Sequence, residues 1–395
     1  MSIEPHSARI LVVDDDPGIL HALSRILGRR HHVACVSSGP AALEQAQRLR
    51  PDLAIVDIRM PEMSGFEVTR GLKAALRDVD VILMTGNAEE PDDNLIQAID
   101  EGAFYFIQKP FDRRVLLALV NRCLELRRLR EEREKFLRRV ERELEEARQF
   151  QISLLPPPHF EIAGLSIDAR YLACTELAGD FYDYVEANDG AVALLIADVV
   201  GHGTSAAMMT AVVKAAFRAS HVDDYEPRAV VERISEAIRD FDASRFVTLC
   251  CARVNPRHRE LTYVNAGHPQ PIIRTSLPTP LLLEPTAPLL TSALSDLTCE
   301  QATVAFCPGD SILFYTDGVT EASIVAGMFG TDRLISMMTS GAHRGSELLD
   351  EILRELAAFT GSSSHQDDVT LLTLDFSSIV TMSDEISGPI SPTEV

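Results

Sequence analysis

RILVVDDD, residues 9–16, decides the fold of the N-terminal part of this chain. Four apolar residues followed at once by three carboxylates are typical of a strand that is buried on both faces of a sheet and ends at the sheet's edge. Further short apolar runs follow at DLAIVD (52–57), VILMTG (81–86) and AFYFIQKP (103–110), and helical patterns separate them. The alternation predicts a doubly wound α/β domain over residues 1–122, with five parallel strands and five helices.

Residues with useful chemistry stand where these strands are expected to end. Asp14 and Asp15 follow the first strand, and Asp57 follows another. Ligands of doubly wound sheets collect at the carboxyl ends of the strands, and three carboxylates that meet there need a hard cation such as Mg²⁺. Thr85 and Lys109 end two further strands and offer a hydroxyl and an ammonium group to phosphoryl oxygens. The pattern predicts an aspartate that accepts phosphate.

This arrangement resembles the flavodoxin-like receiver domains of response regulators over residues 9–122. The resemblance implies a sensor histidine kinase as partner and a site that requires Mg²⁺. The implied roles are phosphoacceptor for Asp57, Mg²⁺ binding for Asp14, Asp15 and Asp57 with the carbonyl of Arg59, and sensing of the phosphoryl group for Thr85, Lys109 and the rotating aromatic Phe106. The alternative is that these acids only cap helices and loops.

A helical linker is predicted over residues 123–158. Apolar side chains recur at steps of three and four residues from 116 to 126 and from 137 to 147, with Arg130 and Arg133 at the two seam positions between these stretches and Leu154 further on. This is the heptad pattern of a coiled coil. The seam consists of Leu116, Leu119, Cys123, Leu126, Leu137, Val140, Leu144, Ala147 and Leu154. We expect a parallel homodimer through this seam; the alternative is a solvated helix that lies on one domain. The prolines at 156–158 end the helix, because proline has no amide hydrogen to donate.

Residues 159–376 have a different pattern, in which strand-like runs outnumber helical stretches and come in hairpin-like pairs. Helices are expected near residues 204–220, 226–241 and 345–359. This pattern predicts an α+β layered domain. The remaining residues, 377–395, are polar and rich in serine and proline, so we expect them to be disordered.

Four acidic motifs stand out in the C-terminal half: AGDFYD, ADVVGHG, YTDGVTEA and HQDDVT. They place Asp180, Asp198, Asp317 and Asp367 beside glycine or other small residues. Carboxylates from distant segments can hold two divalent ions, which lower the pKa of a bound water and clamp phosphoryl oxygens. Hard oxygen ligands favour Mn²⁺ or Mg²⁺ over Zn²⁺. The motifs predict a two-metal site that hydrolyses phosphomonoesters.

The order and spacing of these motifs, with ARQFQISLLP (147–156) and NAGHP (265–269), resemble the bacterial PPM-type phosphatases related to the stage II sporulation phosphatase. The resemblance covers residues 147–376. It implies a protein phosphoserine or phosphothreonine as substrate, such as a STAS-type anti-sigma-factor antagonist, and a metal-bound hydroxide as nucleophile. The implied roles are bridging of two metals for Asp180 and Asp198, a further ligand in the Val199 carbonyl, and completion of the second metal for Asp317 and Asp367. Ala178 departs from the family's usual glycine.

Several neighbouring residues have two interpretations each. Asp183 and Asp368 are either partners of the metal ligands or solvated and capping residues. His202 is either a proton donor or, by preference, a turn residue that orients its loop. His268 and His365 are interpreted mainly as structural hydrogen-bonding residues.

The composition restricts the remaining functions. A net charge of -22 and the lack of a basic recognition helix argue against nucleic acid as a partner. Neither a signal peptide nor an apolar run of ~18 residues is present, so we expect a cytoplasmic protein without a membrane span. The seven cysteines lack C-x-x-C spacing and are interpreted as reduced thiols. The rival function is a non-catalytic adaptor that uses the phosphatase fold to bind a sigma factor or another regulator.

Overall fold

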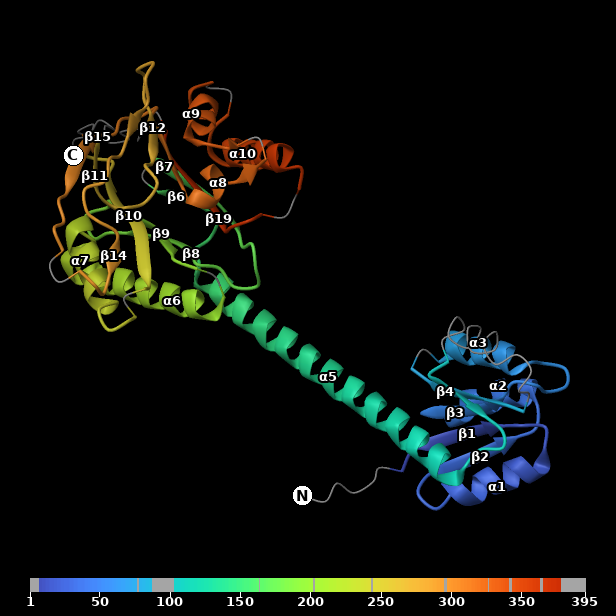
Figure 1. The fold of residues 1–395 in the computed structure, drawn as a ribbon. Helices are drawn as coiled ribbons and strands as arrows, with labels where there is room; N and C mark the ends of the chain where they lie inside the picture. The colour runs from blue at the N-terminus through green and yellow to red at the C-terminus, as the bar shows by residue number, and fades with distance from the viewer. Residues whose placement is uncertain are drawn as a thin grey trace, which may run out of the picture. The chain divides into compact units, whose positions relative to one another are not determined.

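The computed structural model describes a set of residue ranges that together cover most of the chain. They are 7–76, 78–86, 103–162, 164–201, 203–242, 244–294, 297–325, 327–340, 343–362 and 365–377. The chain divides into two compact units, Met1–Val140 and Glu141–Val395, and each is considered by itself (Figure 1). The tail predicted to be disordered, 377–395, lies outside the described residues except for Ser377.

The N-terminal unit contains a parallel sheet of five strands in the order β2-β1-β3-β4-β5. The strands are β1 (Arg9–Val13), β2 (His32–Val36), β3 (Leu53–Asp57), β4 (Asp80–Thr85) and β5 (Tyr105–Gln108). The order reverses between β1 and β3, which is the switch point of a flavodoxin-like sheet. The predicted fold class of this domain is therefore confirmed.

Helices cover both faces of this sheet. They are α1 (Pro17–Leu27), α2 (Gly39–Leu49), α3 (Gly65–Ala75) and the first turns of α5 (Arg113–Leu154). One apolar cluster joins α1 and α5 to one face, and a second joins α2 and α3 to the other. Asp16 caps α1 by accepting a hydrogen bond from the Gly18 amide (2.7 Å). The fifth helix expected here, between β4 and β5, lies outside the described residues.

Helix α5 is 42 residues long and continues past the N-terminal sheet. Its first turns belong to the core of the N-terminal domain, because Leu116, Val120 and Cys123 are fully buried there. Arg130 forms an ion pair with the buried Asp80 at the start of β4 (3.2 Å). The prediction that Leu116 and Cys123 belong to a dimer seam is therefore wrong, since these side chains already pack within their own domain.

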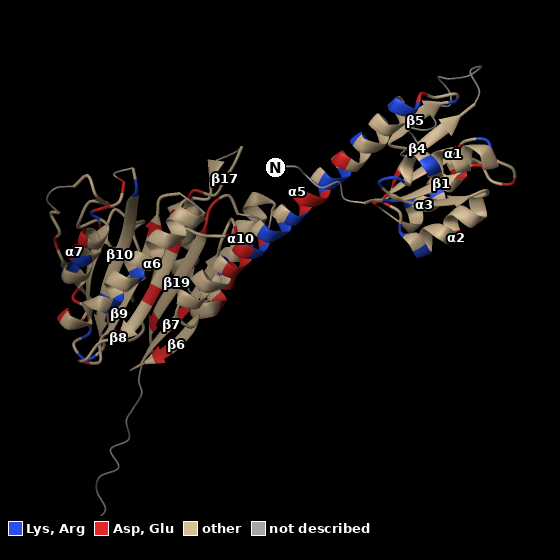
Figure 2. Cartoon of the chain, turned by 90° about the horizontal axis from the view of Figure 1, so that it is seen from below, with Lys and Arg blue, Asp and Glu red and all other residues tan. Residues whose placement is uncertain are grey.

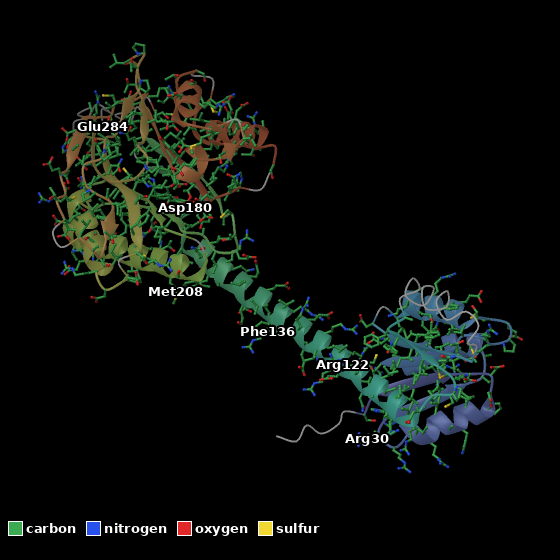
Figure 3. The ribbon with its side chains drawn as sticks, viewed as in Figure 1. Arg30, Arg122, Phe136, Asp180, Met208 and Glu284 are labelled. Carbon is green, nitrogen blue, oxygen red and sulfur yellow. The ribbon has the colours of Figure 1, made fainter. Side chains whose placement is uncertain are left out.

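The middle of α5 is exposed. Figure 2 shows basic and acidic residues interspersed along it. Phe136 and Leu137 are 64% and 45% exposed, and Phe136 projects away from the helix (Figure 3). Val140 and Leu144 are partly buried. Pairing of this stretch with a second protomer stays a prediction.

The C-terminal unit contains two six-stranded sheets of mainly antiparallel strands. The first consists of β8 (Asp180–Glu186), β9 (Val192–Val199), β10 (Phe246–Asn255), β11 (Glu260–Ala266), β14 (Leu290–Thr291) and β15 (Ala302–Ala305). The second consists of β6 (His159–Ile162), β7 (Leu165–Leu172), β12 (Ile272–Arg274), β13 (Leu281–Leu282), β16 (Ser311–Tyr315) and β19 (Val369–Phe376). A short hairpin, β17 (Ser323–Ile324) and β18 (Gly327–Met328), stands apart.

The two sheets pack face to face over an apolar core, and helices cover their outer faces (Figure 1). Helices α6 (Thr204–Ala219) and α7 (Pro227–Ala237) pack on the first sheet, and α9 (Thr331–Ser340) and α10 (Gly345–Thr360) pack on the second. The short helices η1 (Ser220–Asp223) and α8 (Asp317–Thr320) complete the domain. This confirms the predicted α+β layered domain.

All seven cysteines are free thiols, as the sequence predicts. Among the residues that the structure describes, no helix has both the length and the apolar character that crossing a membrane requires.

Candidate active site

Three acids meet at the carboxyl edge of the N-terminal sheet. Oxygens of Asp14, Asp15 and Asp57 lie within 4.8 Å of one another, because β1 and β3 are adjacent and end at the same edge. Asp14 and Asp57 are buried, whereas Asp15 is exposed. An all-oxygen set with one accessible member fits a hard cation that keeps part of its water shell.

Lys109 joins two of these acids. Its Nζ lies 2.5 Å from Asp14 and 2.7 Å from Asp57. Burial raises the pKa of Asp57 above its ordinary value, although Lys109 opposes this shift. One ammonium group stands against three carboxylates, so a divalent cation would complete the charge balance of the site.

Thr85 and Phe106 lie on neighbouring strands beside this site. Thr85 ends β4 and is buried, and its carbonyl accepts a hydrogen bond from the Lys109 amide (2.6 Å). Phe106 on β5 is partly buried and packs against the cluster that joins α2 and α3 to the sheet. These positions are compatible with the sensing roles that the sequence suggests.

In the C-terminal domain, Asp180 and Asp198 face each other across the antiparallel strands β8 and β9. Asp180 is 2% exposed, and its Oδ2 accepts hydrogen bonds from the hydroxyls of Thr316 (2.7 Å) and Thr370 (2.6 Å). Burial raises the pKa of Asp180 well above its ordinary value, and the Asp198 carboxylate adds to the shift. Figure 3 places Asp180 inside this domain.

The acids of the two sheets repel one another, as the pKa values of Asp198 and Asp317 show. Burial raises the pKa of Asp198 to about 7, and repulsion from Asp317 and Asp367 contributes. Burial also raises the pKa of Asp317, again with repulsion from Asp367. Asp317 begins α8, just after β16, and Asp367 precedes β19, the strand that pairs with β16. Mutual repulsion among acids from four segments is the condition that bound divalent cations relieve.

Asp367 and Asp368 form an acidic pair directly before β19. With Cys174 they offer ligand atoms within 4.8 Å of one another. Asp180, Asp198 and Asp317 lie outside that 4.8 Å group in the part of the chain that the structure describes. Asp368 is 4% exposed, so it is not the solvated residue that one interpretation of the sequence suggests.

Asp368 instead supports the segment before Asp180. Its two carboxylate oxygens accept hydrogen bonds from the backbone amides of Cys174 (2.8 Å) and Gly179 (2.7 Å). It therefore orients the backbone beside the site. Burial, with a contribution from the Asp368 carboxylate, raises the pKa of the Cys174 thiol to about 12.

Asp183 has a structural role. It is fully buried and forms ion pairs with Lys214 (2.8 Å) and Arg218 on α6. It lies three positions after Asp180 along β8, and side chains an odd number of positions apart in a strand point to opposite faces. Asp183 anchors α6 to the sheet and does not reach the acidic group.

Gly179 allows the backbone before Asp180 to lie close to the backbone at Val199 and Gly201. A side-chain carbon at this position would clash with the carbonyl oxygens of Val199 and Gly201. The Val199 amide also donates to the Gly179 carbonyl (3.1 Å). The backbone at Val199, whose carbonyl the sequence suggests as a ligand, is thus held directly against the residue before Asp180.

Models of two families match the chain. Residues 10–121 match the response regulator receiver domain, and residues 188–377 match stage II sporulation protein E (SpoIIE). The chain joins a receiver domain to a SpoIIE-type phosphatase domain. The second match includes Asp198, Asp317 and Asp367 but begins after Asp180, so the assignment of Asp180 depends on its pairing with Asp198.

Individual relatives agree with this domain organisation. Phosphoserine phosphatase RsbP of Bacillus subtilis is 28% identical over 201 residues, 50% of this chain and 49% of the relative. Response regulator protein TmoT of Ectopseudomonas mendocina is 38% identical over 120 residues, 30% of this chain and 53% of the relative. The chain thus spans about half the length of each. The SiaA-PP2C domain of Pseudomonas aeruginosa has the fold of the phosphatase domain, with a TM-score of 0.53 and 22% identity over 61% of this chain and 97% of that domain.

Two of the histidines that the sequence analysis discusses, His268 and His365, lie within the described residues. His268 is 2% exposed; its Nδ1 lies 3.1 Å from the Thr248 hydroxyl, and its amide donates to the Asn265 side chain (2.9 Å). Burial lowers the pKa of His268 to about 3, so the ring is neutral near pH 7. Burial also lowers the pKa of the partly exposed His365. His202 lies outside the described residues.

The sequence interpretation missed residues that support the phosphatase site. Thr316 and Thr370 bind Asp180, and Glu321 adds to the raised pKa values of Asp198 and Asp317. Both threonines stand within the acidic motifs, in YTDG and DDVT. The sequence feature that could have identified them is a polar residue at a strand end beside an acid. Gln151, in the ARQFQISLLP motif, was also missed.

Proposed function

We propose that this protein is a response regulator whose output is a metal-dependent phosphatase acting on protein phosphoserine or phosphothreonine. The observation that supports it best is the pairing of Asp180 with Asp198 at the edge where Asp317 and Asp367 arrive from the other sheet. Acids from four separated segments, with raised pKa values for Asp180, Asp198 and Asp317, suit a site that holds divalent cations.

The phosphatase centre would hold two Mn²⁺ or Mg²⁺ ions. Their ligands would be Asp180, Asp198, the Val199 carbonyl, Asp317 and Asp367. When bound, the ions supply an activated water and positive charge for the phosphoryl oxygens. Thr316 and Thr370 fix the Asp180 carboxylate by donating to one of its oxygens, which leaves the other oxygen for a cation. Asp368 holds the backbone before Asp180.

The receiver domain would bind Mg²⁺ through Asp14, Asp15 and Asp57 and accept a phosphoryl group on Asp57 from a sensor histidine kinase. Lys109 already contacts Asp57 and would pair with the new phosphoryl oxygens. The new bonds of Thr85 and Lys109, with a rotation of Phe106, would then shift the population between two arrangements of the receiver.

Helix α5 would transmit this shift, because it begins in the receiver core and ends in the phosphatase domain. In a parallel homodimer through the exposed middle of α5, the two α5 helices would pair differently in the two arrangements of the receiver. The seam of that dimer would include Leu137, Val140 and Leu144. Leu116 and Cys123 would stay in the receiver core.

The substrate proposal follows from the relatives. RsbP is named a phosphoserine phosphatase, and we extend that chemistry to this chain. A STAS-type anti-sigma-factor antagonist carrying a phosphoserine or phosphothreonine is the proposed substrate.

Hydrolysis of p-nitrophenyl phosphate and of a phosphoserine peptide, with and without Mn²⁺, tests this function. We expect Mn²⁺-dependent turnover that Asp198→Ala lowers at least ~100-fold, since removing even an outer partner of a metal ligand typically costs ~10–100-fold. Asp332→Ala, which changes an exposed acid on α9, is the control and should retain wild-type activity. A wild-type protein without Mn²⁺-dependent hydrolysis would favour the adaptor function instead.

A further inference from the structure

Gln151 is buried although it stands near the end of a largely exposed helix. Its side chain is 7% exposed, whereas its neighbours Phe150 and Ile152 are 63% and 47% exposed. The amide nitrogen donates to the Ala178 carbonyl (2.8 Å), and the amide oxygen accepts from the Ala178 amide (3.1 Å). One side chain therefore pairs with both backbone groups of a single residue, as a neighbouring strand would.

The segment that Gln151 holds leads directly into the metal site. Ala178 and Gly179 precede Asp180, and the Gly179 amide donates to Asp368 (2.7 Å) while its carbonyl accepts from Val199 (3.1 Å). All four backbone polar groups of Ala178 and Gly179 are thus paired, and two of the four partners are atoms of Gln151.

The packing of this segment leaves little room for an alternative arrangement. Ala178 is fully buried, and Gly179 lies against the Val199 and Gly201 carbonyls. Gln151 also approaches the hydroxyl of the buried Thr210 on α6 (3.4 Å), which gives the second amide hydrogen a partner. Without Gln151, a buried amide and a buried carbonyl would lose their partners, and such groups are rarely left unpaired.

We propose that Gln151 is a positioning residue of the phosphatase site, and that its hydrogen bonds to Ala178 hold Asp180 where it can bind metal. The inference rests on the proposed function, because it assumes that Asp180 is a metal ligand. Gln151 touches neither the acids nor a substrate, so it acts through the Ala178–Gly179 backbone alone.

The same helix supplies a matched control. Gln149 stands two residues earlier, is exposed, and bonds only to Glu145 on its own helix (3.0 Å) in the described structure. Replacing either glutamine by methionine removes one amide from α5 and preserves the length of the side chain. Only the change at position 151 removes the partners of Ala178.

Mn²⁺ binding to the full chain, measured from the electron paramagnetic resonance signal of free Mn²⁺, tests the role without relying on activity. We expect Gln151→Met to weaken Mn²⁺ binding about tenfold or more, the usual effect of losing a residue that orients a metal ligand. Gln149→Met should bind as the wild type does. Amide hydrogen exchange at Ala178 and Gly179 should quicken in Gln151→Met, while exchange in β10 stays unchanged.

Gln151→Asn covers the case in which Gln151→Met does not fold. Its shorter amide stays polar in the same space but cannot reach both groups of Ala178, so it should show the same direction of loss. Wild-type affinity in the folded variants would overturn the positioning role and leave the proposed function intact. A wild-type chain that binds no Mn²⁺ would contradict the proposed metal site itself.

Discussion

Asp180 and Asp198 are direct cross-strand partners on β8 and β9, so a buried carboxylate and a partly buried one stand opposite each other in the phosphatase domain. Like charges directly opposite in an antiparallel pair destabilise a sheet. Thr316 and Thr370 satisfy one oxygen of Asp180 but supply no positive charge. Cations bound by Asp180 and Asp198 would supply the missing positive charge, so the metal-free and the metal-bound protein should differ in stability.

The first prediction concerns how the stability of the metal-free protein depends on pH. Burial raises the pKa of Asp198 to about 7 in the folded protein, against about 4 in an unfolded chain. The folded state therefore binds more protons between these values, so the free energy of unfolding falls as the pH rises from about 4 to about 7. Thermal unfolding in chelator should show a lower melting temperature at pH 8 than at pH 5.

Two controls accompany this measurement. Asp198→Asn should flatten the dependence, because the amide does not titrate, and Mn²⁺ should stabilise the protein most at the higher pH. A melting temperature that rises steadily from pH 5 to pH 8 in chelator would contradict the account of this pair.

A second prediction concerns Gly179. In Gly179→Ala the new methyl group would meet the carbonyl oxygens of Val199 and Gly201 and push the start of β8 away from the end of β9. We expect kcat/KM for phosphoserine peptide to fall about 100-fold, the loss that a displacement of about 1 Å can cause. Asp332→Ala, which changes an exposed acid on α9, is the control and should keep wild-type activity. Equal activity of both variants would show that the close approach is dispensable.

The receiver provides a third prediction. Incubation with acetyl phosphate and Mg²⁺ should label the wild type, and Asp57→Ala should take up no phosphate.

Lys109→Ala should lose the ion pairs to Asp14 and Asp57 and therefore bind Mg²⁺ more tightly in the unphosphorylated state. Mg²⁺ titration of the full chain measures this, and Lys73→Ala on α3 is the control. Unchanged Mg²⁺ affinity in Lys109→Ala would count against competition between the ammonium group and the ion.

Much of the fold could be predicted because buried parallel strands are continuous apolar runs. Every residue of β3 and β4 is buried, and this is the pattern that the sequence displays. The seam on α5 could not be assigned by the same reasoning. A stripe at heptad spacing has the same appearance whether its own domain or a second chain covers it, and Leu116 and Cys123 are covered by the receiver.

The acids of the phosphatase site were recognisable from local motifs, but the residues that hold them in place were not. Thr316 and Thr370 reach Asp180 across 136 and 190 residues of sequence. Gln151 likewise meets Ala178 only after the chain has folded. Such contacts have no local sequence pattern, since they depend on how two sheets and a helix pack together.

The dimer gives a fourth prediction. If the exposed part of α5 pairs with a second chain, light scattering should report a dimer at micromolar concentration, and Leu137→Glu with Val140→Glu should yield a monomer, because charges in a coiled-coil seam are not tolerated. Gln149→Glu adds one negative charge off the seam and should remain dimeric. A monomeric wild type, with and without beryllofluoride on Asp57, would refute the pairing.

The most direct test of the central claim is the anomalous diffraction of Mn²⁺ in crystals of the full chain. We predict two strong peaks in the phosphatase domain, with ligands from Asp180, Asp198, Asp317 and Asp367. The absence of any peak among these four carboxylates at saturating Mn²⁺, in a folded protein, would contradict the claim that they form a metal-dependent hydrolytic site.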